Sequence, residues 1–281
     1  MYTLISALGV GIAASGLFLF IWDSIWATIL PGFFVGLFCF VWINRRVGKR
    51  VEALTQQADL ELTQAQSIAQ RSGAKGGAIL LRGMDSSILK LRGALLFSKW
   101  QLGLAPMLNG RIGMMLYAKT VVLKQLNRKS EIPDALAQSV PFLEKSMVSG
   151  PKAKLLSALW PAWAMLACAH YRLGHDLDQV VEVLERAVKS APKNGLLWSI
   201  YGWVLTAKKR TDEAVSVLAR GATAASDDPY LIENYTLAQN GKKPRMKAYG
   251  EQWYQFGLEQ PKMQAGPKTA HPRARMGGRR R

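Results

Sequence analysis

The sequence predicts an all-α membrane protein, in which a hairpin of two transmembrane helices is followed by an α-solenoid of helix pairs. Two apolar runs without any charge, residues 3–21 and 25–43, predict the hairpin. A repeat of about 34 residues in the C-terminal half predicts the solenoid. An irregular helical bundle that ends in repeats is the alternative fold.

The two apolar runs are each long enough to cross a hydrocarbon core, which takes roughly 20 helical residues. Because so few residues separate them, the second helix must return antiparallel to the first. A cleaved signal peptide is disfavoured, since residues 1–5 carry no Lys or Arg. Residues 1–46 therefore form the predicted transmembrane hairpin.

Aromatic and basic residues at the ends of these runs predict how the hairpin is anchored. Tryptophans are enriched at membrane interfaces, and here they are Trp22, Trp26 and Trp42. The basic residues that follow the second run are Arg45, Arg46, Lys49 and Arg50. By the positive-inside rule, we expect both termini and the repeat domain in the cytoplasm, most simply at a bacterial inner membrane.

Small residues four positions apart occur in both apolar runs and let two helices approach closely. Such pairs are Gly9 and Ala13, Gly11 and Ser15, and Gly32 and Gly36. We expect Gly9, Ala13, Gly32 and Gly36 to pack the hairpin. The same surface can instead form a homodimer.

Residues 47–77 are predicted to be an amphipathic helical linker that ends in a glycine-rich break. Its apolar stripe comprises Val51, Leu54, Ala58, Leu62, Ala65 and Ile68, which packs on the domain or pairs with a second copy. Residues 78–160 are predicted to be helical, with one or two helices over 78–108, ended by Pro106 and Asn109-Gly110. A further helix pair, a degenerate repeat, is expected over 112–147. Leu95–Trp100 belongs to the core or dips into the bilayer surface.

Three repeating units occupy residues 161–261, and each is predicted to be two amphipathic helices joined by a turn. In the unit 195–228, large and small residues follow the repeat spacing at Trp198, Tyr201, Gly202, Leu205, Ala214, Leu218 and Gly221. In the unit 161–194, the matching residues are Tyr171, Leu184, Ala187 and Pro192. On these residues the chain resembles the tetratricopeptide repeat family. The last unit matches only at Tyr235 and Ala248, and its second helix is expected over 245–257.

The resemblance implies a groove that binds a protein or peptide partner along the first helix of each unit. The residues that it places there are Met165, Ala169, Arg172, Ser199, Trp203, Thr206, Glu233, Asn234 and Leu237. Trp203 is the natural anchor for an apolar side chain of a partner. Alternatively, Trp203 packs within the stack.

No motif for catalysis, a cofactor or a metal ion is found in the sequence, so we do not expect an enzyme. His170 and His175 are five residues apart, and a continuous helix would place them on different faces. Cys39 and Cys168 are isolated and are read as small buried hydrophobes.

The chain is strongly basic, with 37 Lys+Arg, 19 Asp+Glu and a net charge of +18. Residues 262–281 hold seven of these basic residues and no acid, which predicts a disordered tail. This tail can bind anionic lipid or RNA. The function expected from the sequence is a membrane-anchored adaptor or scaffold that recruits a protein. The alternative is charge-driven association with nucleic acid or ribosomes at the membrane.

Overall fold

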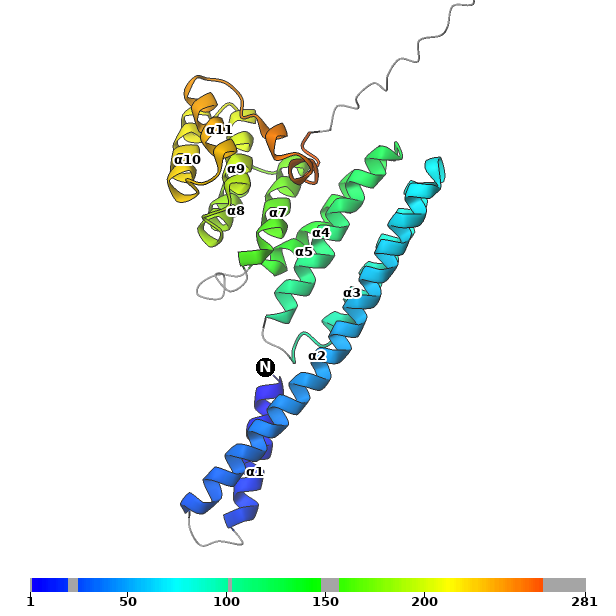
Figure 1. Ribbon diagram of the computed structural model, residues 1–281, viewed down its shortest axis with the longest axis vertical. Helices are drawn as coiled ribbons and strands as arrows, with labels where there is room; N and C mark the ends of the chain where they lie inside the picture. Colours follow the sequence, from blue (N-terminus) through cyan, green and yellow to red (C-terminus); the bar gives the residue numbers. More distant parts are fainter. Residues whose placement is uncertain (1, 20–24, 101–102, 148–156, 260–281) are drawn as a thin grey trace, which may run out of the picture.

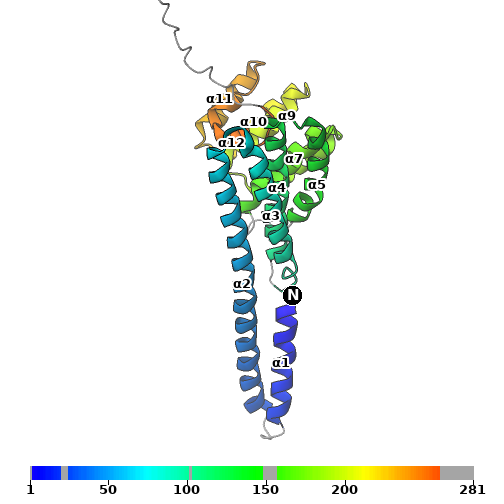
Figure 2. The same cartoon turned by 90° about the vertical axis from the view of Figure 1, so that its right-hand side faces the viewer.

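The computed structural model describes residues 2–19, 25–100, 103–147 and 157–259, and these ranges contain helices and no strand. The all-α prediction is therefore confirmed. The molecule is elongated, with a two-helix stalk at one end and a helical domain at the other (Figures 1 and 2). Trp22 and the basic tail, residues 262–281, lie outside the described residues.

The stalk consists of α1 (Tyr2–Leu19) and the first half of α2 (Ile25–Arg71). The two helices touch through glycines, so that their backbones are in direct contact. A Cβ atom added to Gly11 would lie 3.0 Å from the Gly32 carbonyl oxygen, and one added to Gly36 would lie 3.0 Å from the Ala7 oxygen. This close contact is the packing that small residues allow in membrane helices.

The expected contribution of Gly9 and Ala13 to this contact is wrong. A Cβ atom on Gly9 would meet nothing within 4 Å, and Ala13 is exposed. The face of α1 that meets α2 is formed by Ala7, Gly11 and Ser15, four residues apart. Because each helical residue turns by about 100°, a residue two positions away lies on nearly the opposite side.

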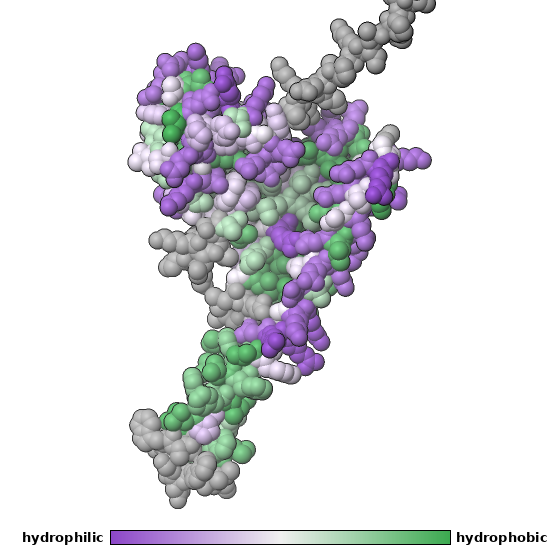
Figure 3. All heavy atoms as spheres, viewed as in Figure 1, coloured by the Kyte–Doolittle hydropathy of each residue, from purple (hydrophilic) through white to green (hydrophobic). Residues whose placement is uncertain are grey.

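Both stalk helices are long and apolar enough to span a membrane. Most of their apolar side chains point away from the protein, for example Ile12 at 70 % exposure and Phe38 at 71 %. The helix of a soluble core would bury such side chains, whereas lipid solvates them. Figure 3 shows a largely hydrophobic surface over the described part of the stalk, which gives way to a more hydrophilic one where the domain begins.

The second span and the amphipathic linker form one uninterrupted helix, because α2 runs for 47 residues. A helix of this length extends about 70 Å. Beyond the stalk, α2 packs along α3 (Gly76–Leu95), where Ser87 Oγ donates to the Ala58 carbonyl at 2.7 Å. The apolar stripe of residues 47–77 thus packs on the domain of the same chain, although Ile68 at its far end is exposed.

The middle of the domain is the antiparallel pair α4 (Leu104–Gln125) and α5 (Ile132–Ser146). Pro106 and Gly110, expected to end a helix, lie inside α4. Pro106 is tolerated because the first-turn N–H groups of a helix have no partner within the helix. Gly110 is buried against Leu159 and Ser146, so its lack of a side chain allows close packing.

The C-terminal part contains two helix pairs followed by a single helix. These are α7 (Trp160–Leu173), α8 (Leu177–Ser190), α9 (Gly195–Ala207), α10 (Thr211–Ala224) and α11 (Pro229–Gln239). The helices α9 and α11 begin at side-chain caps, Asn194 and Asp228, whose oxygens accept from backbone N–H groups. Gly202 lies against Leu218, and Gly221 against Trp198, so small residues let the pairs close.

The expected second helix of the third unit, over residues 245–257, is not formed. The structure has instead two short pieces, η4 (Met246–Tyr249) and α12 (Glu251–Tyr254). They are separated by Gly250, with φ 57° and ψ −134°, a conformation that a helix excludes. The remaining 3₁₀ turns are η1 (Gly73–Lys75), η2 (Lys129–Glu131) and η3 (Ser157–Leu159).

Candidate functional site: a helical face covered by the C-terminal segment

Residues 245–259, which we call the strap, lie across the first helices of the repeat units. The strap starts beside α11, passes α9, and ends near α7 and α4 (Figure 1). Its largest apolar side chains, Met246, Trp253 and Phe256, are fully buried. The face on which the sequence places a partner groove is therefore covered by the chain itself.

At its first end, the strap is held by buried polar side chains. The Asn234 Oδ1 atom accepts a hydrogen bond from the Arg245 backbone N–H at 2.6 Å. The Asn234 amide donates to Ser199 Oγ at 3.2 Å, and Ser199 bonds the Tyr249 hydroxyl at 2.9 Å. Buried polar groups need such partners, and here the strap supplies them.

The centre of the strap is aromatic. The ring of Trp203 meets Trp253 edge-to-face at 5.4 Å and Tyr171 at 5.8 Å. The carboxylate of Glu259 accepts from the Trp203 indole N–H at 3.3 Å and from that of Trp253 at 3.2 Å. One carboxylate thus fixes an indole of the strap against an indole of α9.

At its second end, the strap reaches α4. The Phe256 carbonyl accepts a hydrogen bond from the buried Tyr117 hydroxyl. The centroid of the Phe256 ring lies 6.4 Å from that of the Trp160 ring. Arg172 stacks over Tyr117 at 5.3 Å and donates to Thr120 at 3.0 Å. Burial is the main cause that raises the pKa of Tyr117, so this hydroxyl stays protonated and remains a donor.

The structure brings most of the predicted groove residues to this face, but in different roles. Ser199, Trp203 and Asn234 contact the strap directly, and Glu233 forms an ion pair with Arg245 at 2.7 Å. Met165 and Ala169 are buried, and Arg172 lies beside Gly257 of the strap. The Thr206 hydroxyl donates to a carbonyl of its own helix. Leu237 borders a hollow of about 410 Å³.

The strap residues that fill this face were not predicted as contacts. The sequence predicts a helix that contains Tyr249, Trp253 and Phe256, and it predicts no role for Glu259. The sequence did contain a signal, because Gln252 and Gln255 stand where a second repeat helix needs apolar or small residues. Gly250 and Gly257, both with positive φ, also break that helix.

His170 and His175 are close together, so the expectation that they lie on different faces is wrong. Their Nδ1 atoms are 2.7 Å apart and their ring centroids 4.8 Å. The reason is that α7 ends at Leu173 and Gly174 adopts a left-handed conformation, which turns the chain back. Burial, and then the neighbouring His175, lower the pKa of His170. Among the described residues, no cluster of three or more His, Cys, Asp or Glu side chains is suited to a metal ion.

The predicted anchoring residues Trp42, Arg45, Arg46, Lys49 and Arg50 are all exposed on α2, just past its apolar half. The Arg46 guanidinium stacks over the Trp42 ring at 5.2 Å. Trp26 belongs to the first turn of α2.

No protein-family model matches the chain, and no curated protein matches it.

Proposed function

We propose that the protein is a membrane-anchored helical adaptor, whose repeat face binds a peptide segment of a partner protein. The observation that supports this is the strap itself, a short segment held on that face by aromatic and polar contacts. The strap occupies the position of the ligand. The partner would bind when the strap leaves.

The strap also indicates the chemistry of the ligand. It presents two aromatic anchors, Trp253 and Phe256, followed by the carboxylate of Glu259. Complete burial of one such aromatic side chain contributes about 1.5–3 kcal/mol. A competing segment must therefore bring aromatic side chains of similar size, because a polar peptide would not replace the burial lost.

The stalk gives this binding a location. Its two apolar helices hold the repeat domain at a membrane surface. A partner in the same membrane then meets the domain at an increased effective concentration, so that a weak peptide contact is sufficient. Membership in the tetratricopeptide repeat family is part of this proposal and rests on the spacing of residues such as Trp198, Gly202 and Gly221.

The test uses the full-length protein in detergent and a fluorescent peptide with the sequence of residues 244–261. In the variant Trp253→Ala/Phe256→Ala, the strap loses its two anchors, so we expect the peptide to bind in trans with roughly micromolar affinity. The wild type should bind it much more weakly, because its own strap competes. Fluorescence anisotropy measures both.

The matched controls are a peptide with the same two alanine substitutions and a protein that also carries Trp203→Ala. The strap-released protein should not bind the alanine-substituted peptide, and the protein with Trp203→Ala should not bind the unchanged peptide. A strap-released variant that keeps its helical circular dichroism but binds no peptide would contradict a peptide-binding face. Salt-sensitive recovery of RNA that disappears when residues 262–281 are removed would support the charge-driven alternative instead.

A further inference from the structure

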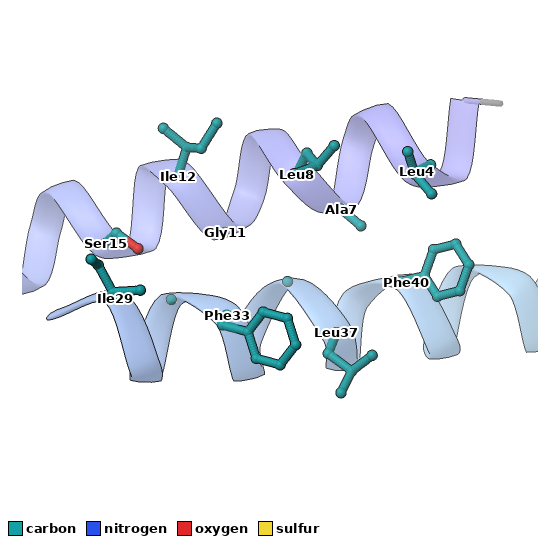
Figure 4. A pocket seen from close by; sticks show the side chains of 12 residues that line it. Leu4, Ala7, Leu8, Gly11, Ile12, Ser15, Ile29, Phe33, Leu37 and Phe40 are labelled. Carbon is teal, nitrogen blue, oxygen red and sulfur yellow. The ribbon is translucent and has the colours of Figure 1, made fainter. Parts of the chain in front are cut away.

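A second hollow lies where the stalk meets the domain, and we call it the junction pocket. It measures about 300 Å³ and is lined by residues from α1, from α2 and from the turn that follows α3. The side chains that matter are Ser6, Trp42, Arg46, Arg50, Phe97 and Trp100. The pocket thus combines two guanidinium groups, one hydroxyl and three aromatic rings. It differs from the almost entirely apolar hollow between the stalk helices, in whose lining Ser15 is the one polar side chain among the described residues (Figure 4).

The junction pocket lies at the depth where a membrane would end. The Tyr2 backbone N–H donates to the Lys99 carbonyl at 3.1 Å, and Thr3 Oγ1 donates to the Trp100 carbonyl at 2.6 Å. These bonds tie the turn after α3 to the first residues of the first span. At the same level, Leu96 is 78 % exposed, which suits a side chain immersed in lipid. Figures 1 and 2 both show the start of α1 next to this turn.

Within the described part of the chain, no carboxylate forms an ion pair with the two guanidinium groups of the pocket. Residues 24–51 and 86–130, which supply every α2 and turn residue of the pocket, contain no Asp or Glu. None of the ion pairs found among the described residues involves Arg46 or Arg50. Two exposed cations therefore face a pocket at a membrane interface without a protein counter-ion.

We propose that the junction pocket binds the phosphate group of an anionic phospholipid. Arg46 and Arg50 would donate to the phosphate oxygens, as guanidinium groups do in planar, paired hydrogen bonds. Ser6 adds a hydroxyl donor from the other stalk helix. The indoles of Trp42 and Trp100 occupy the headgroup level that tryptophan favours.

The acyl chains would extend from the pocket along the exposed apolar side chains of the stalk. Inorganic phosphate offers the same anion but nothing for the apolar wall of the pocket, which includes Ile43, Val47 and Phe97. The surroundings of the two arginines therefore favour a lipid over a soluble anion. This proposal does not depend on the repeat face or the strap.

The test is native mass spectrometry of the full-length protein, released from nanodiscs that contain phosphatidylcholine and phosphatidylglycerol. Wild-type protein should retain phosphatidylglycerol in preference to phosphatidylcholine. Each guanidinium that contacts the phosphate should strengthen binding roughly fivefold, so Arg46→Gln/Arg50→Gln should lower the preference about 25-fold. The control Arg45→Gln/Lys49→Gln removes the same charge from neighbouring positions outside the pocket and should keep most of it.

A second variant separates the pocket from general charge. Ser6→Leu fills the pocket from α1, keeps every basic residue and suits a membrane helix, so it should also abolish retention. Equal losses in the two double variants, or unchanged retention in Ser6→Leu, would overturn the proposal. Displacement of the lipid by millimolar inorganic phosphate would also overturn it, because it would assign the pocket to a soluble anion.

Discussion

Asn234 shows how a single side chain can hold a segment of the chain in place. It is fully buried on α11 and uses both ends of its amide, toward Ser199 and toward the Arg245 backbone. The strap begins at this point, so its first hydrogen bond depends on one side chain. The same residue would contact a peptide that replaced the strap.

We expect Asn234→Ala to destabilise the protein by about 1–3 kcal/mol, because the Arg245 N–H loses its acceptor and Ser199 keeps only its bond with Tyr249. Denaturant unfolding in detergent measures this loss. The strap should also exchange its amide hydrogens faster. The control Asn240→Ala removes an exposed amide that bonds Thr236 and should cost under about 0.5 kcal/mol. Equal effects would show that Asn234 has no special role.

His170 makes stability depend on pH. Burial lowers its pKa in the folded protein below the ordinary value of 6.5, so the unfolded chain binds its proton more readily. The stabilisation from the neutral ring is complete above that ordinary value. This stabilisation is lost as the pH falls from the ordinary pKa through the lowered pKa of the folded protein. We expect the melting temperature of the wild type to fall more between about pH 7.5 and 5 than that of His170→Gln. Parallel pH profiles would contradict this.

The stalk shows why the same substitution can have different effects at two glycines of one helix pair. Gly36 faces α1, and a Cβ atom there would lie 3.4 Å from the Gly11 Cα. Gly9 faces away from α2 and has open space around it. The helix contact therefore follows the face of each glycine and not its presence in an apolar run.

Gly36→Leu should separate the stalk helices and destabilise the protein by about 1–3 kcal/mol. Gly9→Leu is the matched control and should leave stability unchanged. Thermal unfolding in detergent compares them. If Gly9→Leu instead changes the oligomeric state on size-exclusion chromatography, that face of α1 is the surface of a dimer.

The elements differ in how far sequence predicts them. The apolar runs and the repeat period predicted the stalk helices and α7 to α11, because their hydrophobic patterns are local. The apolar stripe after the second run also predicted a helix that continues beyond the span, and α2 does continue without a break from Ile25 to Arg71. The strap was missed because its contacts, such as Tyr117 with Phe256, join residues far apart in the chain. The repeat spacing predicts Ser199, Trp203 and Asn234 on one helical face, and the structure brings all three into contact with the strap. Local spacing could not show which segment covers them.

At the scale of the whole molecule, the stalk and the domain have separate interiors. The domain core includes Leu91, Ile112, Trp163 and Leu197, none of which needs the stalk to be buried. The stalk and the domain are connected by α2 itself and by the hydrogen bonds from Tyr2 and Thr3 to the turn after α3. The domain should therefore fold without the membrane.

A fragment that begins at Val47 should accordingly be soluble and helical without detergent. Circular dichroism and cooperative thermal unfolding test this. The fragment should still adsorb to vesicles, because removal of α1 uncovers Phe97 and Trp100 beside Leu96, which is already exposed. An unfolded fragment would show that stalk and domain form one cooperative unit.

The unbroken α2 has a mechanical consequence. A span adapts to bilayers of different thickness mainly by changing its tilt. Because α2 continues from its apolar half into the domain without a break, in a bilayer the portion beyond Val47 would move as the arm of a lever. A change in tilt of about 10° displaces the far end of this arm, near Arg71, by roughly 6 Å. The helices packed on α2 would have to follow this movement or slide against it, so that membrane thickness would act directly on the domain.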